Sequence, residues 1–207
     1  MRLSWRLASR LSVITLAMLI VVVIALWGLR NERASSQSGP STTLQGTELD
    51  STAAPDFTLT DQNGKTIELS QLHGKAVVLT FLYTHCPDVC PLIASKLHIV
   101  QRQLGKTSAQ VMLVAVSIDP AGDTQASVQQ FSQEHQLVNN WHYLLGTKEV
   151  LEPVWNAYSV YAQAATSKVT HSSAVYVIDK ESRERVFFGE DFTTSDMVTD
   201  LQVLTKE

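Results

Sequence analysis

The sequence predicts an α/β domain, a mixed sheet with helices on both faces, preceded by one N-terminal transmembrane helix. Apolar runs rich in Val, Ile and Leu alternate with segments that repeat apolar residues at helical spacing. This alternation is typical of parallel strands joined by right-handed helical crossovers. The last two predicted strands, 169–178 and 185–188, are close enough in sequence to pair antiparallel, so we expect the sheet to be mixed. An uncharged run of nineteen residues, 11–29, precedes the domain.

The run 11–29 is long enough to cross the apolar core of a bilayer, roughly 30 Å, as a helix. Three arginines precede it, so residues 1–10 are expected to stay in the cytoplasm and the remainder to be exported. A cleaved signal peptide is the alternative, but its apolar region would be about 7–15 residues long and end at a small-x-small site. Trp27-Gly-Leu-Arg30 is a poor cleavage site, so we favour an uncleaved transmembrane anchor.

An anchor and an exported domain indicate a single-pass protein of a bacterial inner membrane, with its C-terminal domain in the periplasm. A mitochondrial protein that faces the intermembrane space is the other interpretation. It is less favoured because no presequence rich in Arg and Ser precedes the apolar run. Residues 30–52 are rich in Ser, Thr, Gln and Gly and predict a flexible linker, which leaves 53–207 as the folded domain.

Charge excludes one class of partner. The net charge is −4, and four arginines lie within the first thirty residues, which leaves 12 basic and 20 acidic residues in the remainder. A surface with that negative excess repels phosphate backbones, so we expect no nucleic-acid partner.

The order of elements follows from local patterns. A hairpin opens the domain, because two β-rich segments flank Asn63-Gly64, a favoured turn pair. Uninterrupted apolar runs predict buried strands, and amphipathic segments predict helices, with Asp123 or Thr124 as one N-cap and Thr147 as another. The expected order is hairpin 56–60 and 66–69, strand 76–83, helix 92–104, strand 111–118, helix 124–135, strand 141–145, helix 147–158, strands 169–178 and 185–188, and helix 194–204.

Both cysteines of the chain, Cys86 and Cys90, lie in the string Thr84-His-Cys-Pro-Asp-Val-Cys-Pro91, between a buried strand and a helix. Proline fits the first helical position, so Pro91 predicts that Cys90 is close to the N-cap. The first N–H groups of a helix carry partial positive charge, which favours the thiolate. The loop also follows a central strand, where open α/β sheets place their sites.

A purely structural disulfide is the first alternative. A ring this small would stabilise the fold by about 2 kcal/mol, against roughly 3 kcal/mol for a fifteen-residue ring. A stabilising bridge would link distant segments, so we favour a chemical role for the pair.

Ligand counting favours copper if the thiolates bind a metal. Structural zinc is normally bound by four ligands and iron–sulfur clusters by four cysteines, whereas copper can be bound by two thiolates and one imidazole. Among the histidines, His73, His98, His135 and His142 are interpreted as surface or packing residues, and His85 as a neighbour that could supply charge or a proton. His171 opens a predicted strand whose start should lie beside the cysteines. The sequence alone leaves open whether His171 is a ligand or an ordinary surface histidine.

These motifs resemble the Sco/SenC family of membrane-tethered, thioredoxin-like copper proteins that act in cytochrome c oxidase assembly. The cysteine string, the segment Val116-Ser-Ile-Asp-Pro120 with Asp123-Thr124, and Thr170-His171-Ser172 match the family's motifs. The resemblance implies a thioredoxin-like fold and a copper site of Cys86, Cys90 and His171, binding Cu(I), Cu(II) or both. Thr170 departs from the family, which often has Asp before the ligand histidine. A carboxylate there could orient the imidazole.

The sequence thus predicts a metallochaperone rather than an enzyme. The resemblance implies that copper, received from an unknown donor, passes to the binuclear CuA site of cytochrome c oxidase subunit II. The alternative is a thiol–disulfide oxidoreductase in which Cys86 attacks and Cys90 resolves the mixed disulfide. Three residues, rather than two, separate the cysteines, and no proline follows Pro153 to face them, which weakens that alternative. A peroxiredoxin-like peroxidase is disfavoured because its Pro-x-x-x-Thr-x-x-Cys pattern is missing.

Overall fold

A computed structural model describes residues 18–19, 43–137, 139–165, 168–171 and 174–207; for 162–165 and 168–171 it describes the backbone. The chain divides into two compact units, 1–43 and 44–207. The strands of the second unit are β1 (Thr47–Glu48), β2 (Thr58–Asp61), β3 (Thr66–Glu68), β4 (Ala76–Leu82), β5 (Val111–Ser117), β6 (Trp141–Leu145), β7 (Ala162–Ala165), β8 (Lys168–His171), β9 (Val175–Ile178) and β10 (Glu184–Phe188). Its helices are α2 (Val89–Leu104), α3 (Gln125–Glu134), α4 (Lys148–Ala157), α5 (Thr194–Leu204) and the 3₁₀ turns η1 (Leu69–Leu72) and η2 (Gly105–Gln110).

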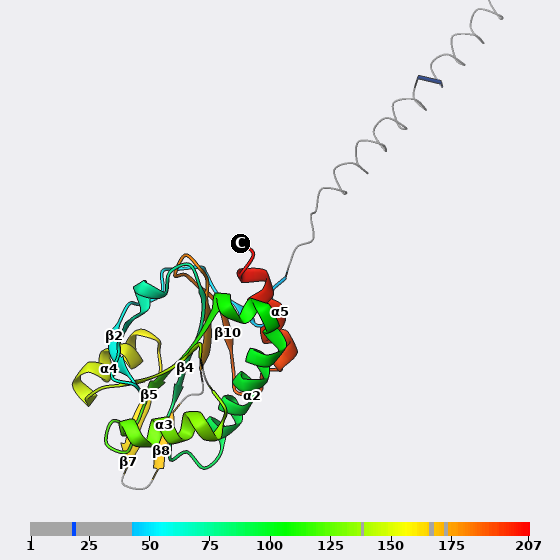
Figure 1. The fold of residues 1–207 in the computed structure, drawn as a ribbon. Helices are drawn as coiled ribbons and strands as arrows, with labels where there is room; N and C mark the ends of the chain where they lie inside the picture. The colour runs from blue at the N-terminus through cyan, green and yellow to red at the C-terminus, as the bar shows by residue number, and fades with distance from the viewer. Residues whose placement is uncertain (1–17, 20–42, 138, 166–167, 172–173) are drawn as a thin grey trace, which may run out of the picture. The chain divides into compact units, whose positions relative to one another are not determined.

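Within the described part of the chain, eight strands form one mixed sheet in the order β1-β10-β9-β4-β5-β6-β2-β3 (Figure 1). Strands β4, β5 and β6 are parallel, whereas β9 is antiparallel to β4 and pairs with β10 as a hairpin. The predicted mixed sheet is therefore confirmed. β4 and β5 are buried along their whole length, as their uninterrupted apolar sequences predict.

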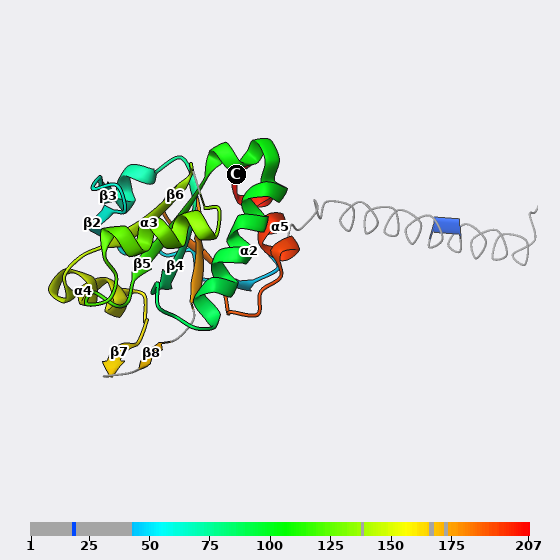
Figure 2. The ribbon, with the colours of Figure 1, turned by 60° about the horizontal axis from the view of Figure 1, so that its bottom comes forward.

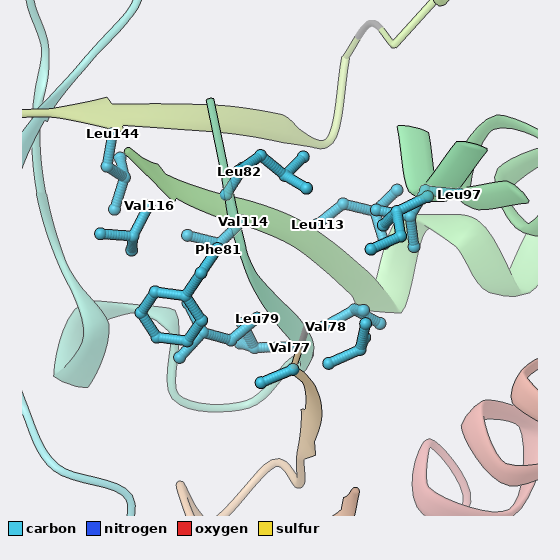
Figure 3. Close-up of a cluster of buried hydrophobic side chains, with 14 of the residues drawn as sticks. Val77, Val78, Leu79, Phe81, Leu82, Leu97, Leu113, Val114, Val116 and Leu144 are labelled. Atoms are coloured by element: carbon cyan, nitrogen blue, oxygen red, sulfur yellow. The ribbon is translucent and has the colours of Figure 1, made fainter. Parts of the chain in front are cut away.

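Helices cover both faces of the sheet (Figures 1 and 2). Strands β4, β5 and β6 are successive neighbours in the sheet, so right-handed crossovers place α2 and α3 on the same face. Helix α5 packs against α2. The end of α4 covers the other face, where the ring of Tyr158 lies 5.8 Å from that of Phe81. Figure 3 shows the two layers of this core, with Leu97 and Leu113 on the α2 side and Phe81 and Val116 on the opposite side.

The folded unit begins at Leu44, earlier than the predicted boundary at residue 53. Leu44 is buried, and β1 pairs with β10 at the edge of the sheet. The backbone N–H groups of Gln45 and Gly46 donate to the buried carboxylate of Asp200, at 2.7 and 3.0 Å. A Cβ atom at residue 46 would come within 2.4 Å of Val186, so the close approach of this segment to the sheet requires glycine. The end of the predicted linker is thus part of the domain.

The predicted strand 169–178 is wrong as a single element. The structure ends β8 at His171 and begins β9 at Val175, and β8 pairs with β7 in a separate hairpin. His171 therefore ends one strand instead of opening the next. β7 lies in a segment for which the sequence predicted no strand.

The helix boundaries agree closely with the patterns that predicted them. Thr124 caps α3 by accepting the Ser127 N–H, and α5 spans Thr194–Leu204 as expected. Thr147 is the N-cap residue of α4, although its side chain accepts no helix N–H. Among the described residues no helix is both long and apolar enough to cross a membrane. The predicted anchor 11–29 falls outside those residues except at Met18 and Leu19.

Candidate metal-binding dithiol site

The cysteine loop leaves the carboxyl end of β4 and enters α2, which begins at Val89 with Asp88 as its N-cap residue. Cys90 is therefore the second helical residue and Pro91 the third, where Pro91 was predicted to be the first. Proline is tolerated at both positions because the first-turn N–H groups have no partner within the helix. The prediction that Cys90 lies at the helix N-terminus is confirmed to within two residues.

The two cysteines are free thiols held against each other. Cys90 is fully buried, and Cys86 is 8% exposed. The backbone N–H of Cys90 donates a hydrogen bond to Sγ of Cys86 at 3.3 Å. This N–H belongs to the first turn of α2 and has no acceptor within the helix. Its hydrogen bond to the sulfur of the preceding loop stabilises that sulfur as a thiolate.

The pKa of Cys86 is lowered from its ordinary value of 9.0. Burial raises the pKa, but hydrogen bonds from the backbones of Cys90 and Asp88 and from the side chains of Cys90 and Tyr83 outweigh it. Cys86 is consequently the more nucleophilic thiol and the better ligand at neutral pH.

The pKa of Cys90 is raised above 9.0. Burial is the main cause, and the charge of Cys86 and of Asp123 adds to it, although the Tyr83 backbone donates a hydrogen bond that lowers it. With Cys86 ionised, Cys90 remains protonated and donates its S–H to the neighbouring sulfur. The pair therefore carries one negative charge more readily than two.

Tyr83 is a site residue that sequence reasoning placed only at the end of a strand. Its side chain is 8% exposed and hydrogen-bonds Cys86. Burial, this hydrogen bond and the charges of both cysteines raise the pKa of Tyr83 to about 12. The phenol therefore stays protonated and serves as a donor to the Cys86 sulfur.

Asp123 fixes the start of the cysteine loop from the β5–α3 connection. Its Oδ1 accepts the Thr84 N–H at 2.8 Å and the Thr84 hydroxyl at 2.7 Å, two residues before Cys86. Its Oδ2 accepts the hydroxyls of Ser117 at 2.6 Å and Tyr143 at 3.2 Å. Burial raises the pKa of Asp123, while the hydrogen bonds from Ser117 and Thr84 lower it. The sequence singled out Asp123 as a possible cap, but Thr124 caps α3 and Asp123 orders the site.

Most histidines bond to groups outside the dithiol. His85 is exposed, and its Nδ1 lies 3.2 Å from the hydroxyl of Thr84, so it remains a neighbour of the loop. His73 is an exposed residue after η1. The other contacts of ring nitrogens are His98 to the Gln136 carbonyl at 3.1 Å, His135 to the Ser95 hydroxyl at 3.4 Å, and His142 to the Asp61 carboxylate at 2.9 Å.

His171 ends β8, and its side chain lies outside what the structure describes. The chain re-enters the main sheet close by, because Val175 pairs with Thr80 of β4 and the Thr80 hydroxyl donates to the Ala174 carbonyl at 3.1 Å. Ala174 follows His171 by three positions, a span of about 11 Å at most. Figures 1 and 2 draw the β7–β8 hairpin at the end of the sheet from which the chain passes into α2. Among the described residues, no group of three or more His, Cys, Asp or Glu side chains is arranged to hold a metal.

The donor chemistry suits a soft metal. Two sulfurs, one of them readily ionised, lie at a helix N-terminus, which is an environment that favours Cu(I) or zinc over hard cations. The same pair suits thiol–disulfide exchange. The fold and the dithiol together define a thioredoxin-like domain with a paired-cysteine site after a central strand.

The family model described as SCO1/SenC matches residues 45–206, so the chain belongs to the SCO1/SenC family. The structure of copper-bound ScoI from Bradyrhizobium japonicum superposes with a TM-score of 0.66 and 30% identity, covering 73% of this chain and 99% of that one. The SCO2-like protein RP587 of Rickettsia prowazekii is 26% identical, over 69% of this chain and 72% of its own. BsSco, described as a member of the Sco family of cytochrome c oxidase assembly proteins, shares the fold, with a TM-score of 0.67 and 21% identity, covering 78% of this chain and 98% of its own.

Proposed function

We propose that this protein is a copper metallochaperone that holds one copper ion through Cys86, Cys90 and His171. The observation that carries the proposal is the hydrogen bond from the Cys90 N–H to Cys86 Sγ, which draws two soft donors together at a helix N-terminus. Two thiolates and one imidazole form a donor set that suits copper. The copper bound to the Bradyrhizobium relative supports the choice of metal.

His171 is the proposed third ligand. Support comes from the re-entry of the chain at Ala174, whose carbonyl accepts the Thr80 hydroxyl near the carboxyl end of β4. We therefore expect an imidazole three positions earlier in the chain to reach the loop that follows β4. A site with only three protein ligands suits transfer, because an incoming thiolate can enter before a resident ligand leaves.

The proposed acceptor is the CuA site of cytochrome c oxidase subunit II, and the copper donor is unknown. The description of BsSco as a cytochrome c oxidase assembly protein supports an oxidase as the client. We further propose that residues 11–29 anchor the protein in a bacterial inner membrane and that the domain faces the periplasm. The uncharged run and the arginines before it support this orientation.

The test is a Cu(I) titration of the fully reduced protein against a chromogenic Cu(I) chelator, with X-ray absorption to detect sulfur ligands. We expect one equivalent bound tightly through both cysteines. His171→Ala should weaken this binding by more than about tenfold, a difference of roughly 1.4 kcal/mol or more. His98→Ala is the matched control, since its imidazole contacts the Gln136 carbonyl. If His171→Ala binds copper as tightly as the unaltered protein, the three-ligand site is wrong.

Acceptor identity needs a separate measurement. Copper-loaded protein should transfer its ion to the purified CuA domain of subunit II, with the appearance of the CuA absorption spectrum. Transfer should fail from Cys86→Ser and from Cys90→Ser. Efficient loading of the acceptor by free Cu(I) alone, with no acceleration by this protein, would contradict delivery.

A thiol–disulfide oxidoreductase is the second candidate, and the unequal cysteines favour it. Cys86, with its lowered pKa, has the properties of an attacking thiol, and the buried Cys90 those of a resolving thiol. In the forward step the Cys86 thiolate would attack a partner's disulfide and release one partner thiolate. Cys90 would then displace the second, which leaves Cys86 and Cys90 oxidised and the partner reduced. Rapid turnover of a model disulfide by the His171→Ala variant, without retained Cu(I), would favour this function.

A further inference from the structure

A cavity of about 220 Å³ lies at the amino-terminal ends of β4 and β5, the opposite end of these strands from the cysteine loop. The residues that line it include two histidines, His73 and His142, and Met112. Met112 is 8% exposed, which is enough for its side chain to line the cavity. These are three soft or borderline ligand side chains outside the dithiol site.

The ring of His142 is oriented by a buried carboxylate. Its Nδ1 lies 2.9 Å from Oδ2 of Asp61, whose side chain is 1% exposed. The other oxygen of Asp61 accepts the N–H groups of Asn63 and Lys65, at 2.9 and 2.8 Å. Because Asp61 acts as an acceptor at every contact, Nδ1 of His142 is the donor. In the neutral ring Nε2 then carries the free lone pair, as in the carboxylate–histidine–metal arrangement of metalloproteins.

Met112 and His142 face the same side of the sheet. Val114 of β5 pairs with His142 of β6, and Met112 precedes Val114 by two residues, so the two side chains are diagonal neighbours on one face. Long side chains reach across such a diagonal. His73 enters the same cavity from the end of η1.

The charged residues around the cavity bear on which soft metal ion it could bind. Lys65 and Lys75 are among the residues that line the cavity, and Glu68 is the one acidic residue among the described lining residues. Both oxygens of Glu68 already accept hydrogen bonds, from Ser70 and Gln71. With Asp61 behind His142 included, two cations face two carboxylates, so the cavity offers no net negative charge to attract a divalent ion over a monovalent one. Thioether and imidazole ligands prefer Cu(I) among monovalent metals.

We propose that Met112, His142 and His73 form a second, cysteine-independent Cu(I) site at the end of the domain away from the dithiol. The site goes beyond the proposed function, since it needs neither cysteine nor His171. Asp61 is its positioning residue and acts through the imidazole of His142.

The experiment uses the full chain in detergent with Cys86→Ser, Cys90→Ser and His171→Ala combined, which removes the proposed primary site. Titration with Cu(I) alone, in competition with a chromogenic chelator and without oxygen, should show one equivalent bound. Met112→Leu conserves volume and should weaken binding by more than about tenfold. Asp61→Asn should weaken it by about 10- to 100-fold. X-ray absorption should show sulfur scattering that disappears in Met112→Leu.

Two matched controls separate ligand loss from general damage. Met197→Leu alters a buried methionine of α5, and His98→Gln alters an imidazole of α2; neither should change Cu(I) binding. The proposal is overturned if the cysteine-free chain binds no Cu(I), if Met112→Leu binds as tightly as its parent, or if Zn²⁺ competes equally with Cu(I). None of these results would affect copper binding by the intact dithiol, so the two proposals fail independently.

Discussion

Asp123 and Thr84 form a two-point hydrogen bond in which one carboxylate oxygen accepts both the backbone N–H and the hydroxyl of the threonine, at 2.8 and 2.7 Å. Asp123 belongs to the connection after β5, and Thr84 lies two residues before Cys86. The carboxylate therefore ties the cysteine loop to a neighbouring strand. The position of the first thiol depends on a side chain 37 residues farther along the chain.

Asp123→Ala should loosen the cysteine loop. Removing the carboxylate leaves the buried hydroxyls of Ser117 and Tyr143 without their acceptor, which should lower the free energy of unfolding by about 1–3 kcal/mol and weaken Cu(I) binding. Asp123→Asn should restore most of both quantities, because its amide oxygen can accept from Thr84 and its amide nitrogen can donate to the two hydroxyls. Urea unfolding and chelator competition measure the effects. Equal losses in the two variants would show that charge, rather than hydrogen-bond geometry, is what Asp123 supplies.

Alkylation of the reduced native protein should modify Cys86 and spare Cys90. The hydrogen bonds to Cys86 keep its pKa below the ordinary 9.0, so its reactive thiolate persists at lower pH, while burial keeps Cys90 protonated. A pulse of iodoacetamide across a range of about pH 6 to 9, followed by peptide mass spectrometry, gives both rates. Preferential labelling of Cys90 would contradict the assigned roles.

The same two pKa shifts have opposite effects on stability. For Cys90 the folded pKa exceeds the unfolded one, so its contribution to stability is present below about pH 9 and is lost as the pH rises further. For Cys86 the folded pKa is lower, so its contribution is present above the unfolded pKa and is lost as the pH falls through the folded pKa. Cys90→Ser should therefore reduce the alkaline decline in unfolding free energy, and Cys86→Ser should not.

Local patterns were sufficient for the elements that are buried or amphipathic along their own length. The apolar runs of β4 and β5 predict strands without knowledge of their partners, and α5 matches its predicted bounds. The cysteine pair was also evident, because proline and two thiols occur together at a helix start. These features depend on residues that are adjacent in sequence.

The missed features depend on contacts between distant segments. β1 is only two residues long, too short to show a strand pattern in its own sequence. It forms because the edge of β10 is available for pairing. β8 pairs with β7 outside the main sheet, and the residues of 169–178 alone do not encode this contact with another segment. The bond between Asp123 and Thr84 requires two loops to meet, which no local periodicity encodes. His171 was selected by family resemblance, and its role as a ligand stays a prediction.

Asp61→Asn should reduce stability at neutral pH and change the response to acid. Burial raises the pKa of Asp61, but hydrogen bonds from the Lys65 and Asn63 backbones and from His142 lower it below 3.8 overall. The carboxylate thus contributes stability above about pH 4, and the contribution is lost as the pH falls through the folded pKa. We expect a loss of about 1–3 kcal/mol at neutral pH, which shrinks near pH 3 because protonated Asp61 resembles the amide. Urea unfolding at both pH values measures the difference, with Asp50→Asn as an exposed control.

A chain that begins at residue 53, the boundary predicted from composition, should be less stable than one that begins at residue 44. The shorter chain lacks Leu44 from the core, and it lacks β1 from the edge of β10. It also removes the two N–H donors of Asp200, a fully buried carboxylate whose pKa burial already raises. A buried polar group that loses its partners costs about 1–3 kcal/mol, and a charged group costs more.

Asp200→Asn separates these contributions. In the chain that begins at residue 53, the neutral amide removes the cost of an uncompensated charge, so it should recover part of the lost stability. In the chain that begins at residue 44, the same substitution should destabilise, because an amide accepts the Gln45 and Gly46 N–H groups less well than a carboxylate does. Thermal unfolding of the four proteins tests this reversal of sign. Equal stability of the two unsubstituted chains would mean that residues 44–52 contribute nothing to the stability of the domain.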